Sequence, residues 1–86
     1  MYVIIVYDIG VERINKIHKY LKTTVHWIQN SVFEGELSKS QLKKLKMDLI
    51  EIIDKDIDSV IIFQFPKKFL KKDILGVEKN SIDFIL

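Results

Sequence analysis

The chain has 86 residues, enough for one small domain and too few for two, so we expect residues 1–86 to form a single domain. Hydrophobic residues make up 48% and charged residues 30%, which is a globular rather than a disordered composition. The absence of cysteine excludes disulfides and thiolate metal sites. No apolar run approaches the roughly 20 residues that cross a bilayer, and no signal-type segment opens the sequence, so we expect a cytoplasmic protein.

The formal net charge is only +2, but the lysines are unevenly distributed. Two groups stand out, Lys39, Lys43, Lys44 and Lys46 in one segment and Lys67, Lys68, Lys71 and Lys72 in another. Clustered lysines can bind phosphates without the whole protein being strongly basic. Lysines of helices and loops more often serve only to solvate the surface, and composition alone favours that interpretation.

The first half of the sequence predicts a strand, a helix and two short strands. Residues 2–8 are strongly apolar and predict a buried strand, with Gly10 marking its exit. Ile14, Ile17 and Leu21 follow helical spacing, which predicts an amphipathic helix over residues 11–22. The segment 24–37 is rich in β-branched and aromatic residues but polar at 29–31, which favours two strands joined by a turn or bulge.

The second half predicts a helix and two further strands. Ser38 and Gln41 have the spacing of a capping box and mark the start of the helix. Its buried stripe is expected to consist of Leu42, Leu45, Leu49 and Ile52. Residues 59–65 predict a strand that Pro66 ends, because proline cannot donate to a ladder. The apolar residues 82–86 predict a last short strand.

This order of elements predicts an α+β, ferredoxin-like βαββαβ fold with an antiparallel sheet and an extra C-terminal strand. The two helices of such a fold cover one face of the sheet only. The strands at 2–8 and 59–65 are apolar at both parities, which indicates burial on both faces. We therefore predict a homodimer in which the sheets of two identical subunits pack against each other.

Many common catalytic constellations are missing from the sequence. It contains no thiol nucleophile and no glycine-rich phosphate loop, and no serine stands in a nucleophile-elbow context. His18 and His26 lack metal-ligand spacing; we interpret His18 as a surface residue of the first helix and His26 as a strand residue beside Trp27. Carboxylates remain as the candidate catalytic groups.

Asp8 stands out among the acids because it ends the most apolar strand. Burying an ionised carboxylate without a partner is costly, so Asp8 must be paired, protonated, metal-bound or exposed. An acid at this place most often caps the strand end or the start of the following helix, where it accepts backbone N–H groups. If the two-fold axis of a dimer passes near the strand ends, two copies of Asp8 would instead face each other. A cation such as Mg²⁺, which takes oxygen ligands and supports phosphodiester hydrolysis, would then neutralise them.

The segments VYDIG and WIQNSVFEGEL, followed by a capped lysine-rich helix, closely resemble the CRISPR-associated protein two family, over essentially the whole chain. The resemblance implies a ferredoxin-like homodimer that acts as a metal-dependent endonuclease on single-stranded RNA or double-stranded DNA. It makes Asp8 the catalytic residue and the ligand of Mg²⁺ or Mn²⁺. It also places Tyr7 and Phe33 beside the site and Arg13 at a position that is often basic.

The candidate nucleic-acid-binding residues are Tyr7, Arg13, Phe33, Lys39, Lys43, Lys44 and Lys46. Tyr7 and Phe33 would be core or interface residues in any fold of this kind, and we favour that role over substrate contact. Arg13 is the sole arginine of the sequence, so a nucleic-acid grip must rest mainly on lysine point charges. This favours contact with the backbone, independent of base sequence.

Two alternatives to a CRISPR-associated endonuclease stay open. The family's general role is that of an adaptor, in which a non-catalytic dimer bridges dimers of the CRISPR integrase and holds spacer DNA. Residues 77–86 would then pack on a partner subunit, with IDFIL at 82–86 as the expected contact. A more distant alternative is a toxin-like RNase that shares this small fold.

Overall fold

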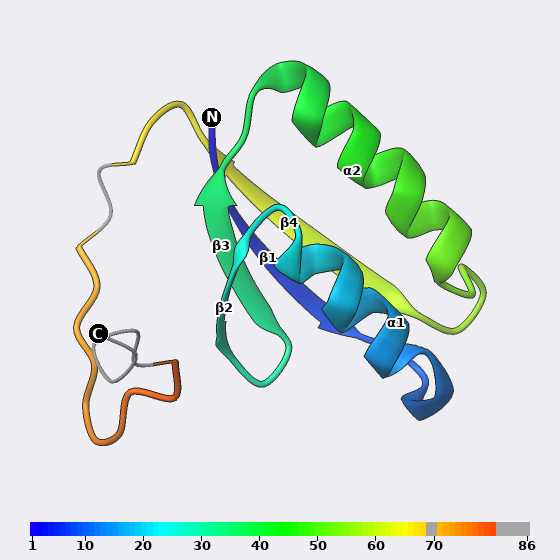
Figure 1. Cartoon of the computed structure of the whole chain (residues 1–86), viewed down its shortest axis with the longest axis horizontal. Helices are drawn as coiled ribbons and strands as arrows, with labels where there is room; N and C mark the ends of the chain where they lie inside the picture. The colour runs from blue at the N-terminus through cyan, green and yellow to red at the C-terminus, as the bar shows by residue number, and fades with distance from the viewer. Residues whose placement is uncertain (69–70, 81–86) are drawn as a thin grey trace.

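In the computed structural model of the protein, residues 1–68 and 71–80 are described. Their elements, in chain order, are β1 (Tyr2–Asp8), α1 (Val11–Lys22), β2 (His26–Gln29), β3 (Val32–Glu36), α2 (Lys39–Ile52) and β4 (Ser59–Phe65) (Figure 1). The strands form one sheet in the order β2-β3-β1-β4, and every neighbouring pair is antiparallel. This confirms the predicted ferredoxin-like α+β fold. The extra strand predicted at 82–86 lies outside the described residues.

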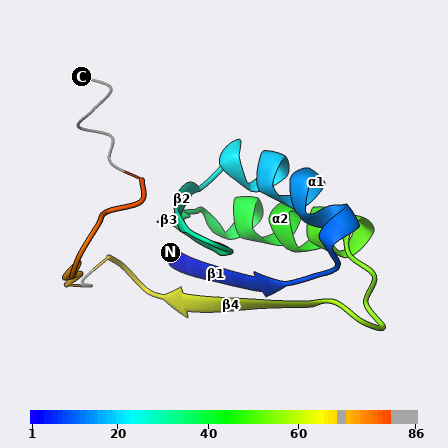
Figure 2. The same cartoon turned by 90° about the horizontal axis from the view of Figure 1, so that it is seen from below.

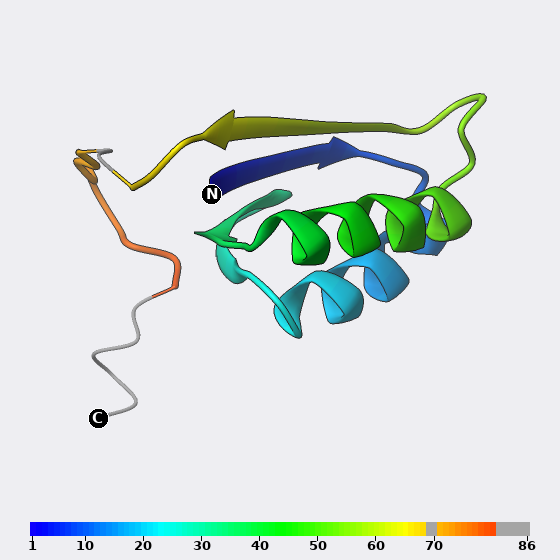
Figure 3. The same cartoon turned by 90° about the horizontal axis from the view of Figure 1, so that it is seen from above.

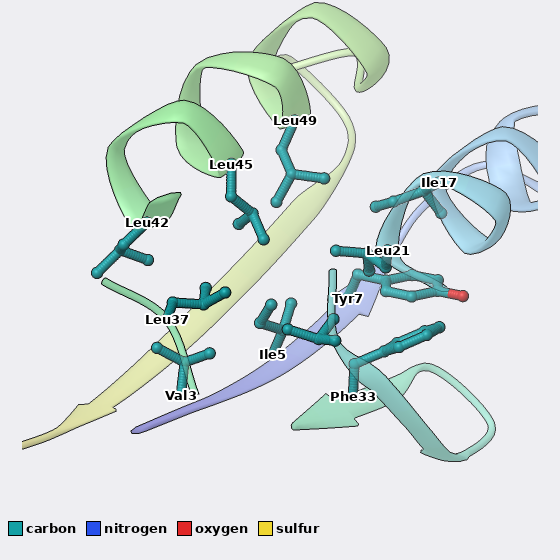
Figure 4. Packing of buried hydrophobic residues seen from close by; sticks show 11 residues of the cluster. Val3, Ile5, Tyr7, Ile17, Leu21, Phe33, Leu37, Leu42, Leu45 and Leu49 are labelled. Carbon is teal, nitrogen blue, oxygen red and sulfur yellow. The ribbon is translucent and has the colours of Figure 1, made fainter. Parts of the chain in front are cut away.

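Both helices lie on the same side of the sheet (Figures 2 and 3). Because side chains alternate along a strand, β1 directs Val3, Ile5 and Tyr7 toward the helices. Val3 and Ile5 are fully buried there, together with Phe33 of β3. Figure 4 shows Val3 and Ile5 on the side of the α2 leucines, and Tyr7 and Phe33 on the side of Ile17 and Leu21 of α1.

The N-terminus of α2 is fixed by the predicted capping box. The Oγ of Ser38 accepts a hydrogen bond from the backbone N–H of Gln41 at 3.1 Å, and the Gln41 side chain accepts one from the Ser38 N–H at 2.8 Å. Both bonds satisfy N–H groups that a helix start leaves without partners. The predicted stripe is buried at Leu42, Leu45 and Leu49, and Ile52 is partly buried at its end.

The side of α1 that faces the sheet differs in part from the prediction. Ile17 and Leu21 are fully buried as expected, but Ile14 is 38% exposed. His18, predicted to lie on the surface, is half-buried, and its ring lies 5.1 Å from the ring of Phe33 and 5.9 Å from that of Trp27. The prediction for His18 was wrong because the aromatic side chains of β2 and β3 extend beneath the middle of α1.

The predicted turn between β2 and β3 is confirmed at the polar residues. Asn30 adopts a φ of 45°, the left-handed conformation that asparagine tolerates better than most residues. The register shifts between Trp27 and Gln29, so the hairpin contains an irregularity beside the turn. The indole N–H of Trp27 donates to the Asn30 carbonyl at 2.9 Å, which ties β2 to the turn.

The face of the sheet opposite the helices carries apolar side chains from three strands. We call it the open face; it is formed by Ile4, Val6, Val32, Ile61 and Phe63. Ile61 and Phe63 are each 50% exposed, although both stand in the middle of β4. The sheet thus has one face sealed by helices and one face whose apolar side chains meet solvent.

The segment 71–80 lies beside β2 and β3. Its Lys72 ammonium forms an ion pair of 2.6 Å with Glu34, and its Asn80 amide donates to the Trp27 carbonyl at 2.5 Å. Among the described residues, neither helix has the length and apolar character needed to cross a membrane.

Candidate functional site

Asp8 is the last residue of β1, and its side chain is exposed. Strand alternation puts it in the same row as Ile4 and Val6, so it stands at the end of the open face. Across the ladder it is paired with Ser59, the first residue of β4. Within residues 1–68 and 71–80, no group forms a hydrogen bond or ion pair with the Asp8 carboxylate. The carboxylate is therefore accessible to a ligand from outside the chain.

The helix-capping alternative for Asp8 is wrong, because another aspartate occupies that place. The N-cap of α1 is Gly10, which has no side chain to cap the helix, and its backbone N–H donates to Asp58 Oδ1 at 2.8 Å. Asp58 belongs to the loop between α2 and β4 and its side chain is only 1% exposed. The beginning of α1 is thus held by a carboxylate that lies 48 positions away in the chain.

Arg13 completes the surroundings of Asp58. Its Nε donates to Asp58 Oδ2 at 2.5 Å and its Nη2 to Asp58 Oδ1 at 2.8 Å, a two-pronged pair. The N–H of Asp54 also donates to Oδ2, at 2.8 Å. The hydrogen bonds from Arg13 hold the pKa of Asp58 well below its usual range, and they raise the pKa of Arg13 in turn. Asp58 therefore stays ionised and paired within the chain.

Arg13 was predicted to contact nucleic acid, and the structure places it close to the end of β1. Its side chain is 20% exposed, and its guanidinium is directed at Asp58 and, through Nη1 at 2.7 Å, at Glu12. Two carboxylates thus surround its charge. Sequence reasoning did not single out Asp58, because it belongs to an acid-rich segment where solvated surface is the usual role. The one available signal was that the sole arginine needs an acidic partner. That signal does not identify which acid pairs with it.

Tyr7 and Phe33 lie on the helix-covered side of the sheet, opposite to Asp8. Their rings stack with centroids 6.3 Å apart, and Phe33 is fully buried. The Tyr7 hydroxyl lies 3.4 Å from Nδ1 of His18. Burial raises the pKa of Tyr7 and lowers that of His18. These positions support the packing role and do not support contact of either ring with nucleic acid.

The predicted lysines of α2 divide into two sets. Lys39, Lys43 and Lys46 follow one another at helical spacing and are exposed, so they form a row on one side of α2. Lys44 lies on another side, where its ammonium pairs with Asp48 at 3.0 Å. Asp48 also accepts a hydrogen bond from the Tyr20 hydroxyl at 2.5 Å, which lowers the pKa of Asp48. The row lies in the helix layer, whereas Asp8 ends the open face.

The second lysine group is partly engaged within the chain. Lys72 pairs with Glu34, which also accepts a hydrogen bond from the Tyr2 hydroxyl. Burial alone would raise the pKa of Glu34, but these two bonds lower it overall. The Lys68 ammonium lies 5.3 Å from the centroid of the Tyr2 ring. These two lysines contact the sheet, so the group is not simply a free basic surface.

The model of the family described as CRISPR associated protein Cas2 matches residues 1–73. The chain belongs to the Cas2 family. A relative from Methanocaldococcus jannaschii is named CRISPR-associated endoribonuclease Cas2; it is 55% identical over an alignment that covers 100% of this chain and 76% of that protein. A relative of the same name from Methanothermobacter thermautotrophicus is 48% identical, with 100% of this chain and 96% of that protein covered.

Solved Cas2 structures share the fold. A crystal structure of cas2 matches with a TM-score of 0.87 at 54% sequence identity, covering 94% of this chain and 92% of that one. Streptococcus pyogenes Cas2 at pH 6.5 matches with a TM-score of 0.79 at 28% identity, covering 88% of this chain and all of that one. The family resemblance seen in the sequence is confirmed.

Whether Asp8 suits a metal ion depends on the side chains that lie near it. Among the described residues, no three histidine, cysteine or acidic side chains lie together in an arrangement that could hold a metal ion. An exposed, unpaired carboxylate suits Mg²⁺, which is commonly bound through one or two carboxylates and keeps several of its waters. Asp8 is one such carboxylate, and it would fit this ion if further ligands came from outside the described residues.

Proposed function

We propose that the protein is an endoribonuclease of the CRISPR system that acts as a homodimer, with Asp8 of each subunit in one active site. The observation that carries the proposal is the position of Asp8, an accessible and unpaired carboxylate at the rim of an apolar face that a second subunit would cover. The names of its relatives support cleavage of RNA. The enzyme would work in the cytoplasm, where proteins rarely depend on disulfides, and the chain has no cysteine.

The dimer follows from the imbalance between the two faces of the sheet. Ile61 and Phe63 leave half of their surface in solvent, beside Ile4 and Val6 in the register of β1 with β4. Packing two such faces together would remove this apolar surface from water. Since Asp8 ends the same row, it would lie at the edge of that interface and close to its counterpart.

Three sets of side chains have distinct tasks in the proposed reaction. Asp8 would hold Mg²⁺ or Mn²⁺, and the bound ion would lower the pKa of a water molecule and stabilise charge on the phosphate. Asp58 keeps Arg13 and the start of α1 in place and leaves Asp8 as the free carboxylate. The row of Lys39, Lys43 and Lys46 would contact the phosphate backbone without reading bases.

The test is cleavage of single-stranded RNA and of duplex DNA by the purified protein, with Mg²⁺ or Mn²⁺ and with EDTA. We expect RNA cleavage that EDTA and Asp8→Asn both abolish. Glu51→Gln, at an exposed acid of α2, is the matched control and should cleave normally. Equal cleavage by the Asp8→Asn variant would overturn the catalytic assignment. Cleavage of DNA alone would overturn the assignment of RNA as the substrate.

A second candidate function is a non-catalytic adaptor that bridges integrase dimers and holds spacer DNA. The observation that favours it is the exposed lysine row of α2, which lies apart from Asp8 and would bind nucleic acid without cutting it. The predicted integrase contact at residues 82–86 lies outside the described residues. Spacer acquisition in cells that carry Asp8→Asn separates the two functions. Normal acquisition favours the adaptor, and its collapse with folding intact favours the enzyme.

A further inference from the structure

Only Ile9 and Gly10 separate the candidate ligand Asp8 from the first turn of α1. Such a short connection transmits any movement of the helix start directly to the end of β1. The Gly10 carbonyl accepts the first bond of the helix, from the Arg13 N–H at 3.0 Å. The Gly10 N–H, on the other side of the same residue, is bound to Asp58. Gly10 is thus fixed at both of its backbone polar groups.

Asp58 reaches this connection from the residue directly before β4, the strand that pairs with Asp8. Ser59 stands opposite Asp8 in the ladder, and Asp58 is its neighbour in the chain. The end of β1 is therefore held twice, through the ladder at Ser59 and through the side chain of Asp58 at Gly10. Both contacts originate from two successive residues.

Arg13 determines the orientation of the Asp58 carboxylate. Its Nε and Nη2 donate to the two carboxylate oxygens, at 2.5 Å and 2.8 Å. The planar guanidinium permits only a narrow range of geometries for such a pair. Lysine carries the same charge but cannot form this two-pronged pair. The near-complete burial of Asp58 means that water does not easily replace a lost partner.

We propose that Arg13 and Asp58 form a positioning pair that sets the place of the Asp8 carboxylate, and that Arg13 acts through Asp58 and Gly10 rather than by contact with nucleic acid. This inference rests on the proposed role of Asp8 in the reaction. It assigns a shared task to two residues that are far apart in the chain. It also explains why the arginine beside the site faces inward, toward a buried acid.

The kinetic test compares Arg13→Lys, Asp58→Asn and the double variant, on single-stranded RNA with Mg²⁺ and well below the melting temperature. We expect each single variant to lower kcat by about 10- to 100-fold with KM unchanged, the size of effect seen when groups that orient a metal ligand are removed. The double variant should be no slower than the single ones, because both break the same pair. Lys16→Gln, which removes an exposed charge from α1, should change nothing.

A second readout needs neither metal nor RNA. Hydrogen exchange of the Gly10 amide in the metal-free protein should quicken in both single variants and stay slow in Lys16→Gln, while the amides of Ile5 and Leu45 stay protected. This separates a local loosening from general unfolding. Unchanged exchange at Gly10 would overturn the proposal.

The outcomes also distinguish this inference from the function on which it rests. If Asp8→Asn abolishes cleavage while Arg13→Lys and Asp58→Asn cut normally, the positioning pair is refuted and the catalytic role of Asp8 stands. If Arg13→Lys cuts normally and Asp58→Asn binds RNA more tightly, Arg13 is a phosphate contact and the inference fails. If Asp8→Asn itself cuts normally, the proposed function fails first, and the inference fails with it.

Discussion

The two faces of the sheet are built from the same strands but are finished in different ways. Phe33 points toward the helices and is fully buried, whereas Phe63 points to the open face and is 50% exposed. The helix-covered face is completed by the chain's own leucines from α2. The difference shows that one face specifies the fold of the single chain, while the other is available for association and carries the catalytic candidate at its rim.

The largest effect is expected from the two phenylalanines themselves. Phe33→Ala should lower the free energy of unfolding by about 3–5 kcal/mol, because it empties a fully enclosed site in the core. Phe63→Ala should cost far less at protein concentrations where single chains dominate. Urea unfolding of both variants measures the contrast. Similar losses for the two variants would mean that the open face supports the single chain as much as the core does.

The next prediction concerns association. Phe63→Lys puts a charge into the middle of the open face and should weaken the proposed dimer by about 100-fold or more, because an unpaired buried charge costs roughly 3–5 kcal/mol. Sedimentation equilibrium should then report the 10.2 kDa single chain. Val11→Lys is the matched control, since Val11 is exposed on α1, away from the open face. An unchanged mass of the Phe63→Lys variant would exclude the sheet-against-sheet dimer.

A pH dependence should arise on the helix-covered face. Burial lowers the pKa of His18, so the folded chain binds fewer protons there than the unfolded chain. The free energy of unfolding should therefore fall as the pH drops below about 6.5, the ordinary pKa of histidine. The acids with lowered pKa, Glu34, Asp48 and Asp58, act only at lower pH, because their ordinary values lie near 4.

The measurement is the urea midpoint across this pH range. Its decrease should largely disappear in His18→Gln, which cannot be protonated. His26→Gln changes the exposed histidine of β2 and should leave the decrease in place. A slope that survives in His18→Gln would assign the effect to another group.

The smallest effect concerns the lysines of α2. Lys43→Gln should weaken RNA binding and lower the slope of log affinity against log salt by about 1, the signature of one lost phosphate contact. Lys44→Gln should change the slope less, because Asp48 already neutralises that ammonium. Fluorescence anisotropy with the Asp8→Asn protein measures both without cleavage. If neither variant changes the slope, the row on α2 is only solvated surface.

Local patterns in the sequence were sufficient to predict the helices and strands. The strand at 2–8, the helix at 11–22 and the capping box at Ser38 were all predicted where the structure has them. Each depends on residues within a few positions of one another, through alternation, helical spacing or a capping bond. Asp8 was recognised for the same reason, since its place at the end of an apolar run is visible in the sequence.

What could not be predicted depends on contacts between distant segments. Arg13 and Asp58 are 45 positions apart, and no spacing rule joins them. The burial of His18 depends on aromatic side chains of a hairpin that follows it in the chain. The tertiary arrangement decided both the capping of α1 and the division of the lysines. The capping of α1 is also what distinguishes the bound carboxylate of Asp58 from the exposed one of Asp8.

The pairing of β1 has a consequence for how the protein is made. β1 lies between β3 and β4 in the sheet. Its Tyr2 is paired with Glu36 of β3 on one side and with Phe65 of β4 on the other. The ribosome therefore synthesises this most apolar strand before either of its neighbours. Contacts this distant in sequence slow folding, and an unpaired apolar strand invites association with other chains. The nascent chain should depend on chaperones until β4 has emerged, and premature termination before Ser59 should yield aggregates rather than a smaller stable domain.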